Sequence, residues 1–395
     1  MSIAANRPYQ QCTRCVMDTS DPEIIFDELG HCNHCNSYFA ETALHSYRGE
    51  SSDRELEAII RKIRKDGRGK KYDCLLGISG GVDSCYAAYL LKQWGLRVLL
   101  VHMDNGWDSE VAVKNIKLIT EKLGFDYQSF VLDWEEFRDL QLSFLKASVI
   151  EAETPTDIAI IGSLHQTADK YGIKYIIGGG NAATEGILPA MWHYDCRDTV
   201  FINAVQKQFG TRKLKTFPTC SFWKESYYKF VKGIRMVYPL DYVPFSKQKA
   251  VEVLEKEFGW KEHAGKHYES KFTALIHSYV LPVKFNLDYR RATLSSQICA
   301  GEVRREEALE KLKTVPYNPI TLKADIEYVC KKLRISAEEF DAIMQAPPKT
   351  YRDYPNDEKR LKIIYRTYRR FFGKKRKHEQ AVVIAAVQQL IAMHF

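Results

Sequence analysis

The 395-residue sequence has no hydrophobic run that approaches the length of a membrane span, and its first residues, MSIAANRPYQQC, contain no hydrophobic signal core. We therefore expect no membrane insertion and a cytoplasmic location. Two common phosphate-binding motifs are also missing, because neither G-x-x-x-x-G-K-[ST] nor a G-x-G-x-x-G that follows a strand occurs. Their absence excludes a Walker A site and a dinucleotide site of the usual form.

Acidic residues are absent from one stretch, Lys359 to Lys377, which holds ten basic residues. Removing these ten from the 58 basic residues leaves 48 against 50 acidic ones, so the net charge of +8 is local. Three interpretations are open: a nucleic-acid surface, a dock for an acidic partner, or an amphipathic helix with solvated charges. Nucleic acid is the least expected partner, because gripping it favours a broad positive face.

Cysteine is sparse outside one cluster. Six cysteines are scattered singly, whereas the other four form the pattern C-x2-C-x16-C-x2-C: Cys12, Cys15, Cys32 and Cys35. This spacing matches a four-thiolate zinc site in which each C-x-x-C pair closes a turn around one metal. Sulfur would fill all four tetrahedral positions, so the zinc would be structural. Disulfides are the alternative, although a large chain without a signal peptide is expected in a reducing compartment.

The segment Leu75 to Ser84, LLGISGGVDS, reads as a strand, a glycine turn and the start of a helix. Two adjacent glycines let the backbone approach a ligand closely, and the first N–H groups of a helix favour an anion. The segment therefore predicts a phosphate site. A glycine-rich turn without a ligand is the alternative.

Apolar strands alternate with amphipathic helices after this loop. Further strands are expected at Val98–His102, Ser129–Leu132 and Tyr175–Ile177, with helices near 52–66, 84–94, 111–123, 134–150 and 158–171. This order predicts an α/β fold with a parallel sheet that helices cover on both faces. Ligands of such sheets bind beyond the carboxyl ends of the strands, where Asp104 and Asp133 follow two of them.

The hexapeptide SGGVDS resembles the PP-loop of the ATP pyrophosphatase superfamily. The resemblance implies a Rossmann-like sheet and an ATP site that grips the β and γ phosphates and leaves the α phosphorus open to attack. The implied ligands of ATP are the residues of the hexapeptide itself: Ser79, Gly80, Gly81, Val82, Asp83 and Ser84. Ser79, Asp83 and Ser84 would also be catalytic, and Asp104 would lie near the adenosine.

The segment IIGGGNAATEG, residues 176–186, resembles the G-T-x-N-x-x-E segment of ammonia-using relatives such as NAD synthetase, with Gly179 in place of threonine. By that match Gly180 and Asn181 would shape the nucleotide site. Glu185 would be catalytic by binding Mg²⁺ on the pyrophosphate, because a lone carboxylate would repel polyphosphate. The alternative is a glycine-rich loop with a solvated Glu185.

The block HYESKFTALIHSYVLPVKFNLDYRRATLSSQICAGEVRREEAL, residues 267–309, makes the resemblance more specific. Together with CTRCVMDTSDPEI near the N-terminus and the SGGVDS loop, it resembles the N-acetyl sugar amidotransferase family, the WbpG- and PseA-like proteins of surface polysaccharide and glycan synthesis. We expect three domains: a zinc-binding four-cysteine module at 1–48, a PP-loop ATP pyrophosphatase domain at 49–245 and a helical substrate or partner domain at 246–395.

The family resemblance implies that ATP adenylates the acetamido oxygen of a nucleotide-activated sugar. Ammonia then replaces the AMP to give an acetamidino sugar, with Mg²⁺ on the phosphates. No cysteine of the chain sits in an obvious glutaminase setting, so ammonia would come from a HisH-like glutaminase with a HisF-like companion. The zinc module or the basic stretch would form part of the dock.

Lys284, Arg290 and Arg291 are candidates to bind the phosphates or a sugar carboxylate, because arginine pairs bidentately with oxyanions. Ion pairs on helix surfaces are the alternative. Two other functions compete with the amidotransferase: a tRNA-modifying PP-loop thiolase and a scaffold that senses ATP without turnover. A thiolase is disfavoured because the ATP-binding domain has no second C-x-x-C to hand over sulfur. AMP formation with an acceptor would exclude the scaffold.

Overall fold

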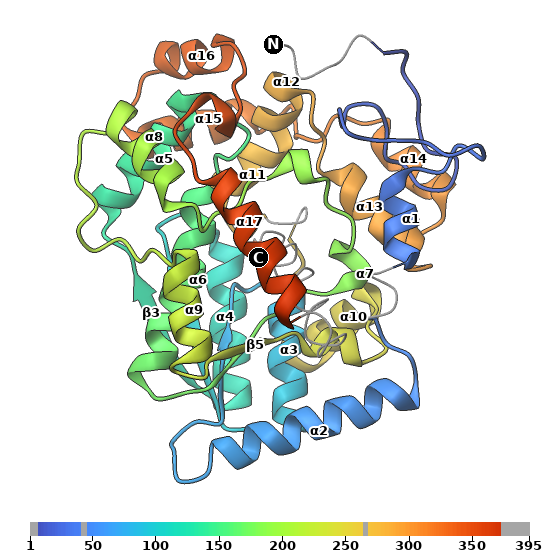
Figure 1. Cartoon of the computed structure of the whole chain (residues 1–395), viewed down its shortest axis with the longest axis vertical. Helices are drawn as coiled ribbons and strands as arrows, with labels where there is room; N and C mark the ends of the chain where they lie inside the picture. Colours follow the sequence, from blue (N-terminus) through green and yellow to red (C-terminus); the bar gives the residue numbers. More distant parts are fainter. Residues whose placement is uncertain (1–6, 41–45, 264–267, 373–395) are drawn as a thin grey trace.

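A five-stranded parallel sheet organises the molecule. The computed structural model describes residues 7–40, 46–263 and 268–372 (Figure 1). The strands lie in the order β3-β2-β1-β4-β5, and every pairing is parallel. Their bounds are β1 Cys74–Gly77, β2 Val98–Asp104, β3 Asp126–Val131, β4 Tyr175–Ile177 and β5 Arg235–Val237. The predicted parallel α/β fold is confirmed.

Successive side chains of the inner strands enter two separate cores. Leu75 of β1 packs with the helices of one face, whereas its neighbours Cys74 and Leu76 pack with the helices of the other. We call the face that Leu75 enters the first face. It is covered by α5 (Trp134–Ala147), α6 (Thr154–Lys170), α8 (Thr199–Phe209) and α9 (Phe222–Phe230). The second face, which Cys74 and Leu76 enter, is covered by α2 (Glu50–Asp66), α3 (Val82–Gln93), α4 (Glu110–Leu123) and α10 (Lys247–Phe258). Because both faces are buried, the inner strands are mostly apolar, with His102 and Asp104 near the end of β2 as polar exceptions.

Two strands differ from the expectation. The third strand begins at Asp126 rather than Ser129, and its side chains are mostly exposed because it lies at the edge of the sheet. The fifth strand, Arg235–Val237, was not predicted: it has three residues, and its side chains are only half buried. Such a short strand gives little periodic signal and forms because β4 offers a free edge.

Residues 239–244 pack against α2 and α3 on the second face of the sheet. They include the 3-10 helix η3 (Pro239–Tyr242), in which Pro239 and Leu240 are buried. The carboxylate of Asp241 accepts a hydrogen bond from the Ala182 N–H at 2.8 Å. The domain boundaries themselves stay a prediction.

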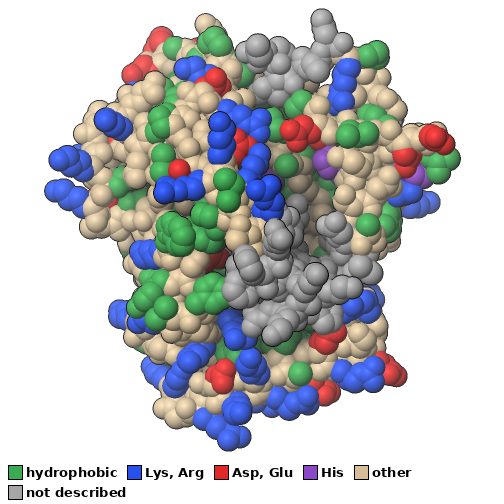
Figure 2. Space-filling view, viewed as in Figure 1, with side chains coloured by type: hydrophobic (Ala, Val, Ile, Leu, Met, Phe, Trp, Pro, Cys, Tyr) green, Lys and Arg blue, Asp and Glu red, His purple; other side chains and the backbone are tan. Residues whose placement is uncertain are grey.

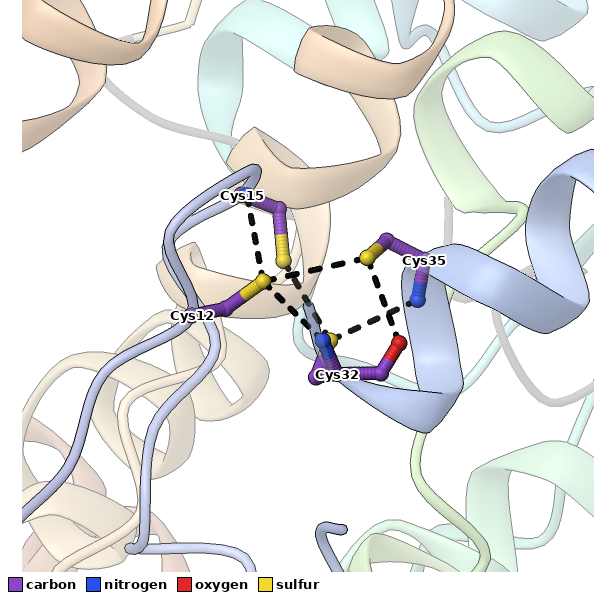
Figure 3. A group of neighbouring side chains, drawn as sticks. All are labelled: Cys12, Cys15, Cys32 and Cys35. Carbon is purple, nitrogen blue, oxygen red and sulfur yellow. Dashed lines mark hydrogen bonds between the residues drawn. The ribbon is translucent and has the colours of Figure 1, made fainter. Parts of the chain in front are cut away.

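The four N-terminal cysteines converge on one point. Cys12 and Cys15 lie on a loop, Cys32 and Cys35 lie at the start of α1 (Asn33–Ala40), and all four are buried (Figure 3). Their sulfur atoms lie within 4.8 Å of one another, with Cys12–Cys35 at 3.7 Å and Cys15–Cys32 at 3.5 Å. These separations exclude the disulfide alternative in this structure. They match the edge of a tetrahedron around one ion with metal–sulfur bonds of about 2.3 Å.

The cysteine module packs on two helices from the far end of the sequence, α13 (Arg290–Cys299) and α14 (Arg305–Leu312). The Arg305 guanidinium donates to the carbonyls of Cys12 (2.8 Å) and Cys15 (3.0 Å), and the Val16 N–H donates to Ser295 Oγ (3.2 Å). Figure 1 shows α1, α13 and α14 side by side. The module therefore supports both helices directly.

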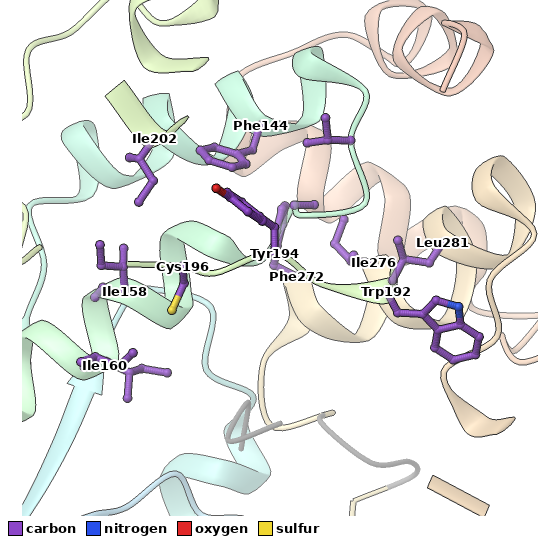
Figure 4. Close-up of a cluster of buried hydrophobic side chains, with 14 of the residues drawn as sticks. Phe144, Ile158, Ile160, Trp192, Tyr194, Cys196, Ile202, Phe272, Ile276 and Leu281 are labelled. Carbon is purple, nitrogen blue, oxygen red and sulfur yellow. The ribbon is translucent and has the colours of Figure 1, made fainter. Parts of the chain in front are cut away.

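The remaining described elements are mostly short helices. They are α7 (Ala182–Glu185), η2 (Ala190–Trp192), α11 (Lys271–Leu275), η4 (Ile276–Val280), α12 (Leu281–Phe285), α15 (Leu322–Leu333), α16 (Ala337–Gln345), η5 (Tyr351–Asp353) and α17 (Glu358–Phe372). Aromatic residues are buried on the first face of the sheet, where Phe144 of α5 and Tyr194 both meet Phe201 of α8 edge to face. Phe144 and Tyr194 lie close together in Figure 4. The mainly helical C-terminal region is as predicted.

Part of the basic stretch forms α17, and residues 373–377 lie outside the described part of the chain. The helix is held by Tyr365, whose hydroxyl contacts Asp195 and whose ring lies under the Arg197 guanidinium. In the space-filling view Lys and Arg side chains gather over the start of this helix (Figure 2). No described helix has the length and apolar character needed to cross a membrane.

Candidate active site

The SGGVDS loop connects β1 to α3 at the carboxyl edge of the sheet. Two serine hydroxyls hold the loop in its conformation. Ser79 Oγ and Ser84 Oγ lie 3.1 Å apart, and the Gly81 N–H donates to Ser79 Oγ at 3.2 Å. Gly80 has φ +87°, a conformation that favours glycine. A Cβ at Gly80 would lie 2.5 Å from the carbonyl oxygen of Ala112 on α4. The turn therefore needs glycine for both its backbone angle and its packing.

Donors from other elements hold the Gly80 carbonyl. Asn115 Nδ2 donates to it at 3.1 Å and Trp260 Nε1 at 2.9 Å. The N-terminus of α3 has no side-chain cap, so its first N–H groups and the positive end of its dipole are available to an anion. The N-terminus of α10 likewise has no side-chain cap, and its Lys247 lines the same cavity. This arrangement suits a bound polyphosphate.

The loop lines a cavity of about 580 Å³, which is large enough for a nucleotide. One wall is the sheet edge, with Ser79, Gly81, Val82, Asp83 and Ser84 from the loop and Gly179 and Gly180 after β4. The C-terminal region supplies another part of the lining, with Glu269, Thr293, Gln297, Glu302, Val303, Glu307 and Lys311. Two parts of the chain that are distant in sequence thus line one cavity.

Carboxylates dominate the polar lining of this cavity. Glu269 is 7% exposed and approaches the loop so closely that a Cβ on Gly81 would lie 2.2 Å from its Oε1. Burial and the charge of Asp83 raise the pKa of Glu302, and Glu185 is 6% exposed. A polyphosphate cannot bind among these groups unless cations offset their charge. The donor set therefore fits Mg²⁺, a hard cation that prefers carboxylate and phosphate oxygens.

Sequence reasoning missed Lys247, Glu269, Glu302 and Lys311, all of which line this cavity. Their approach to the loop depends on how helices distant in sequence pack. One signal was available, because Glu269 lies within the block at 267–309 that carries the family resemblance.

The segment after β4 lies beside the loop. Gly180 and Glu185 line the cavity, and Gly179 packs so tightly that a Cβ would lie 2.8 Å from the Ser84 backbone nitrogen. Asn181 instead caps α7, with its Oδ1 accepting from the Thr184 N–H at 2.9 Å. Asp104 ends β2 outside the described lining, and its carboxylate accepts from the Gly106 N–H at 2.9 Å. Asp133 caps α5.

The three predicted substrate cations lie away from the lining of the cavity. Arg290 pairs with Asp288 at 2.7 Å, and Arg291 pairs with Asp18 of the cysteine module at 3.0 Å. Lys284 Nζ donates to the carbonyl of Ile343, and burial lowers its pKa to about 8. Their contacts match the alternative of ion pairs and structural hydrogen bonds, so the geometry gives no support to a role in substrate binding.

Trp192, His193, Asp195 and Arg197 form a cluster in the sequence that divides between two settings in the structure. Arg197 is 5% exposed and pairs with Asp195 (2.9 Å) and Glu225 (2.8 Å), which makes both carboxylates part of a buried ionic network. Trp192 and His193 line a second, much smaller cavity behind the nucleotide cavity. Only that half of the cluster faces a polar pocket.

Comparison with known proteins matches two parts of the chain to families. Residues 269–371 match the model of the LPS biosynthesis protein WbpG-like, C-terminal domain. Residues 69–180 match the model of the thiamine biosynthesis protein ThiI. The first match covers most of the C-terminal wall of the cavity, and the second covers the loop wall.

Curated relatives match only part of the chain. An uncharacterised protein of Methanocaldococcus jannaschii is 30% identical over 135 residues, 33% of this chain and 45% of its own length. The tRNA-specific 2-thiouridylase MnmA of Flavobacterium johnsoniae is 34% identical over 91 residues, 20% of this chain and 23% of its own. The chain thus spans less than half the length of these relatives.

Solved structures resemble the chain weakly. The NH3-dependent NAD synthetase of Campylobacter jejuni has a TM-score of 0.33 at 13% identity and covers 67% of this chain and 97% of its own. The U34-tRNA thiolase NcsA of Methanococcus maripaludis, solved with its [4Fe-4S] cluster, has a TM-score of 0.32 at 17% identity over 77% and 89%.

The family matches agree with the parallel sheet and with the loop on its carboxyl edge. The matched domains meet at one cavity, which a chance resemblance of a short motif would not produce. The chain thus combines a loop domain of the PP-loop ATP pyrophosphatase superfamily with a WbpG-like C-terminal domain.

Proposed function

We propose that the protein is an ATP-dependent, AMP-forming amidotransferase that converts the acetamido group of a nucleotide-activated N-acetyl sugar into an acetamidino group. One observation carries the proposal: the WbpG-like region, residues 269–371, lines the same cavity as the phosphate loop. This supports a model in which the acceptor binds against the WbpG-like region. We also propose that the protein acts in the cytoplasm, in the synthesis of lipopolysaccharide O-antigen or another bacterial surface glycan, and the description of the matched model as an LPS biosynthesis protein supports this role.

The chemistry needs activation because an amide oxygen is a poor leaving group. The N–H groups at the start of α3 and the hydroxyls of Ser79 and Ser84 would hold the β and γ phosphates of ATP. The acetamido oxygen then attacks the α phosphorus and pyrophosphate leaves. Ammonia adds to the activated carbon, and the C–O bond to AMP breaks.

A divalent cation belongs in this scheme. Glu185 and Glu269 both line the cavity and would hold Mg²⁺ against the pyrophosphate, where it would supply positive charge as the leaving group departs. The four cysteines would hold Zn²⁺, which suits a buried tetrahedral thiolate site. That zinc lies in the module that supports α13 and α14, so its role would be structural.

Mass spectrometry tests the function most directly. The protein is incubated with Mg-ATP, a high ammonium concentration and a pool of UDP- and CMP-linked sugars, and AMP is followed in parallel. We expect one N-acetylated sugar nucleotide to lose the small mass that separates O from NH while AMP accumulates. AMP that forms in the presence of every sugar nucleotide without any such product would count against the proposal.

A tRNA thiolase is the second candidate, because several relatives are 2-thiouridylases. A thiolase that transfers sulfur from a cysteine needs that cysteine beside the nucleotide. No cysteine is among the described residues that line the cavity. Cys85 follows the loop but is fully buried, and burial raises the pKa of its thiol. AMP formation that depends on tRNA would reverse this choice.

Ammonia would be delivered by a HisH-like glutaminase with a HisF-like companion docked on this chain. The basic start of α17 lies beside an exposed apolar patch on α9, which we define as Trp223, Tyr227 and Phe230 with exposures of 67%, 46% and 56%. Phe222 of α9 meets Tyr365 of α17 at 5.5 Å between ring centroids. Hydrophobic and basic side chains gather side by side over α9 and α17 in Figure 2.

If the partner docks on this patch, a substitution there should reduce glutamine-dependent activity and leave ammonium-dependent activity unchanged. Trp223→Ala should reduce glutamine-dependent activity with the partner about tenfold, because aromatic side chains dominate binding energy at interfaces. Activity with ammonium should stay within twofold of the unmodified protein. Ile320→Ala, which removes a 91% exposed side chain elsewhere, is the matched control. Equal loss with glutamine and with ammonium would place the effect in the fold rather than in a dock.

A further inference from the structure

His102 is buried near the carboxyl end of β2, next to the start of the phosphate loop. The residue is 5% exposed, and each of its ring nitrogens has a partner. Nδ1 lies 2.9 Å from the carbonyl oxygen of Ile78, the residue that precedes the loop. Nε2 lies 2.9 Å from Oδ2 of Asp108, which follows β2. The ring therefore joins two segments of the chain.

Both partners of this ring are hydrogen-bond acceptors. A carbonyl oxygen can only accept, so Nδ1 must carry a proton and donate to Ile78. The Asp108 carboxylate also accepts, so its contact with Nε2 needs a second proton, and a ring with both protons is an imidazolium. Burial alone would lower the pKa of His102, but the hydrogen bond and the charge of Asp108 raise it above the ordinary value of 6.5. Geometry and electrostatics thus favour the same charged form.

The other charged groups around the pair come from three elements. Asp104, two residues further along β2, also favours the charged ring. Lys332 of α15 interacts electrostatically with Asp104 and Asp108, and Tyr127 of β3 lies near the same two carboxylates. Two carboxylates against one lysine leave a negative balance, which suits a cationic ring.

The contact with Ile78 fixes the first peptide group of the loop. The Ile78 carbonyl and the Ser79 N–H belong to one planar trans peptide, so they point to opposite sides of the chain. His102 holds the carbonyl, while the Ser79 N–H donates to Ser84 Oγ at 3.3 Å. Ser84 Oγ in turn lies 3.1 Å from Ser79 Oγ. A rotation of this peptide would therefore move both hydroxyls that we propose to hold the phosphates.

The contact with Asp108 reaches the segment that carries Glu269. Asp108 lies at the centre of an antiparallel bridge, in which two backbone hydrogen bonds of 2.7 and 2.9 Å join residues 107–109 to residues 269–271. Glu269 Oε1 approaches the loop so closely that a Cβ on Gly81 would lie 2.2 Å from it. The histidine thus links the start of the loop to the segment that places a carboxylate against its glycines.

We propose that His102 is a positioning residue for ATP, whose protonated ring holds the phosphate loop and the Glu269 segment in the relative position that binds Mg-ATP. The proposal rests on the amidotransferase function above, in which the loop binds ATP and Glu269 holds Mg²⁺. His102 is not among the described residues that line the nucleotide cavity. It acts through Ile78 and Asp108, its two hydrogen-bond partners.

Calorimetric titration with Mg-ATP over a range of pH tests this coupling. The Kd of the unmodified protein should be lowest below the pKa of His102 and rise as the pH increases through it, because the linked arrangement needs the protonated ring. His102→Gln carries no charge and can reach only one of the two partners. It should raise the Kd at least about tenfold, as for loss of a hydrogen bond to a charged group, and remove the pH dependence.

His165→Gln is the matched control. His165 is 3% exposed, and its Nδ1 contacts the Ile161 carbonyl of its own helix at 2.8 Å. This variant also loses a buried imidazole, but it breaks no link between the loop and another segment. Its Kd for Mg-ATP should stay within twofold of that of the unmodified protein and keep the same pH dependence.

Asp108→Asn separates positioning by a charged ring from a purely structural role. The substitution keeps an oxygen that accepts from Nε2 and removes the negative charge. Because that charge raises the pKa of His102, the rise in Kd should begin at a lower pH in this variant. An unchanged Kd in His102→Gln, or a pH dependence that stays in place in Asp108→Asn, would overturn the proposal.

Nitrogen-15 NMR of the histidine rings in the full-length protein needs no nucleotide. The His102 signals, identified by their absence from His102→Gln, should show both ring nitrogens protonated at pH 6.5. A ring that is mostly neutral at this pH would overturn the proposal. Failure of the unmodified protein to bind Mg-ATP at any pH would instead refute the proposed function, so the two failures are distinguishable.

Discussion

Replacing Gly80 by alanine is expected to reduce AMP formation at least about a hundredfold, since a displacement of about 1 Å in a reacting site can cost that much. The new Cβ would lie 2.5 Å from the Ala112 carbonyl oxygen and 2.9 Å from its Cα, so the loop must move away from α4. Its φ of +87° adds strain for any residue with a side chain. The phosphates would then lose their N–H donors.

Pyrophosphate exchange into ATP and AMP release, both per folded molecule, measure this effect. Gly124→Ala is the matched control: Gly124 has φ +64° at the end of α4, but nothing lies within 4 Å of a Cβ there. That control should lose about 1 kcal/mol of stability from backbone strain and keep its activity. A Gly80→Ala protein with normal turnover would show that the loop does not position ATP.

Loss of the metal that we propose for the cysteine module is expected to abolish activity without changing a residue of the nucleotide cavity. Cys12→Ser removes one of four buried thiolates whose sulfurs lie within 4.8 Å, and small modules of this kind do not fold without their ion. When the module unfolds, Arg305 would lose the carbonyls of Cys12 and Cys15 as hydrogen-bond acceptors, and α13 and α14 would lose the contacts that support them. Thr293, Gln297 and Lys311 would then no longer line one cavity with the loop.

Three measurements decide this prediction. Elemental analysis should find one zinc per chain in the unmodified protein and none in Cys12→Ser, and amide exchange should rise at 7–40 and 290–312. Cys330→Ala, a buried cysteine outside the cluster, should keep both metal and activity. Full activity in a metal-free protein would contradict a structural role. Iron at the site would contradict zinc.

Local chemistry explains which parts of the fold were predictable. The glycine turn after an apolar strand was enough to predict the phosphate loop. The apolar strands before Asp104 and Gly178 indicated a buried parallel sheet. The edge strand was placed three residues late because its exposed face removes the hydrophobic pattern, and β5 is too short to have one. Cysteine spacing likewise predicted a convergent cluster, because four thiolates around one ion leave little freedom.

The acceptor side of the site could not be predicted in the same way. Arg290 and Arg291 look like substrate ligands in the sequence, yet Asp288 and Asp18 neutralise them. Asp18 is 272 or more residues away in the chain, so no local pattern reveals that pairing. Glu269 reaches the loop for the same reason, through packing between distant segments. Long-range contacts decide which charged residues are available to a ligand.

The contact between Val16 and Ser295 spans 279 positions of the sequence and has a consequence for biosynthesis. On the ribosome the phosphate loop and most of its sheet emerge long before α13 and α14. The cysteine module is made first, but it can pack on these two helices only late in translation. The nascent chain therefore has its phosphate loop but lacks the C-terminal part of the cavity lining. If the protein has the function that we propose, adenylation of a sugar requires that both ends have met, which ties the onset of catalysis to completed assembly.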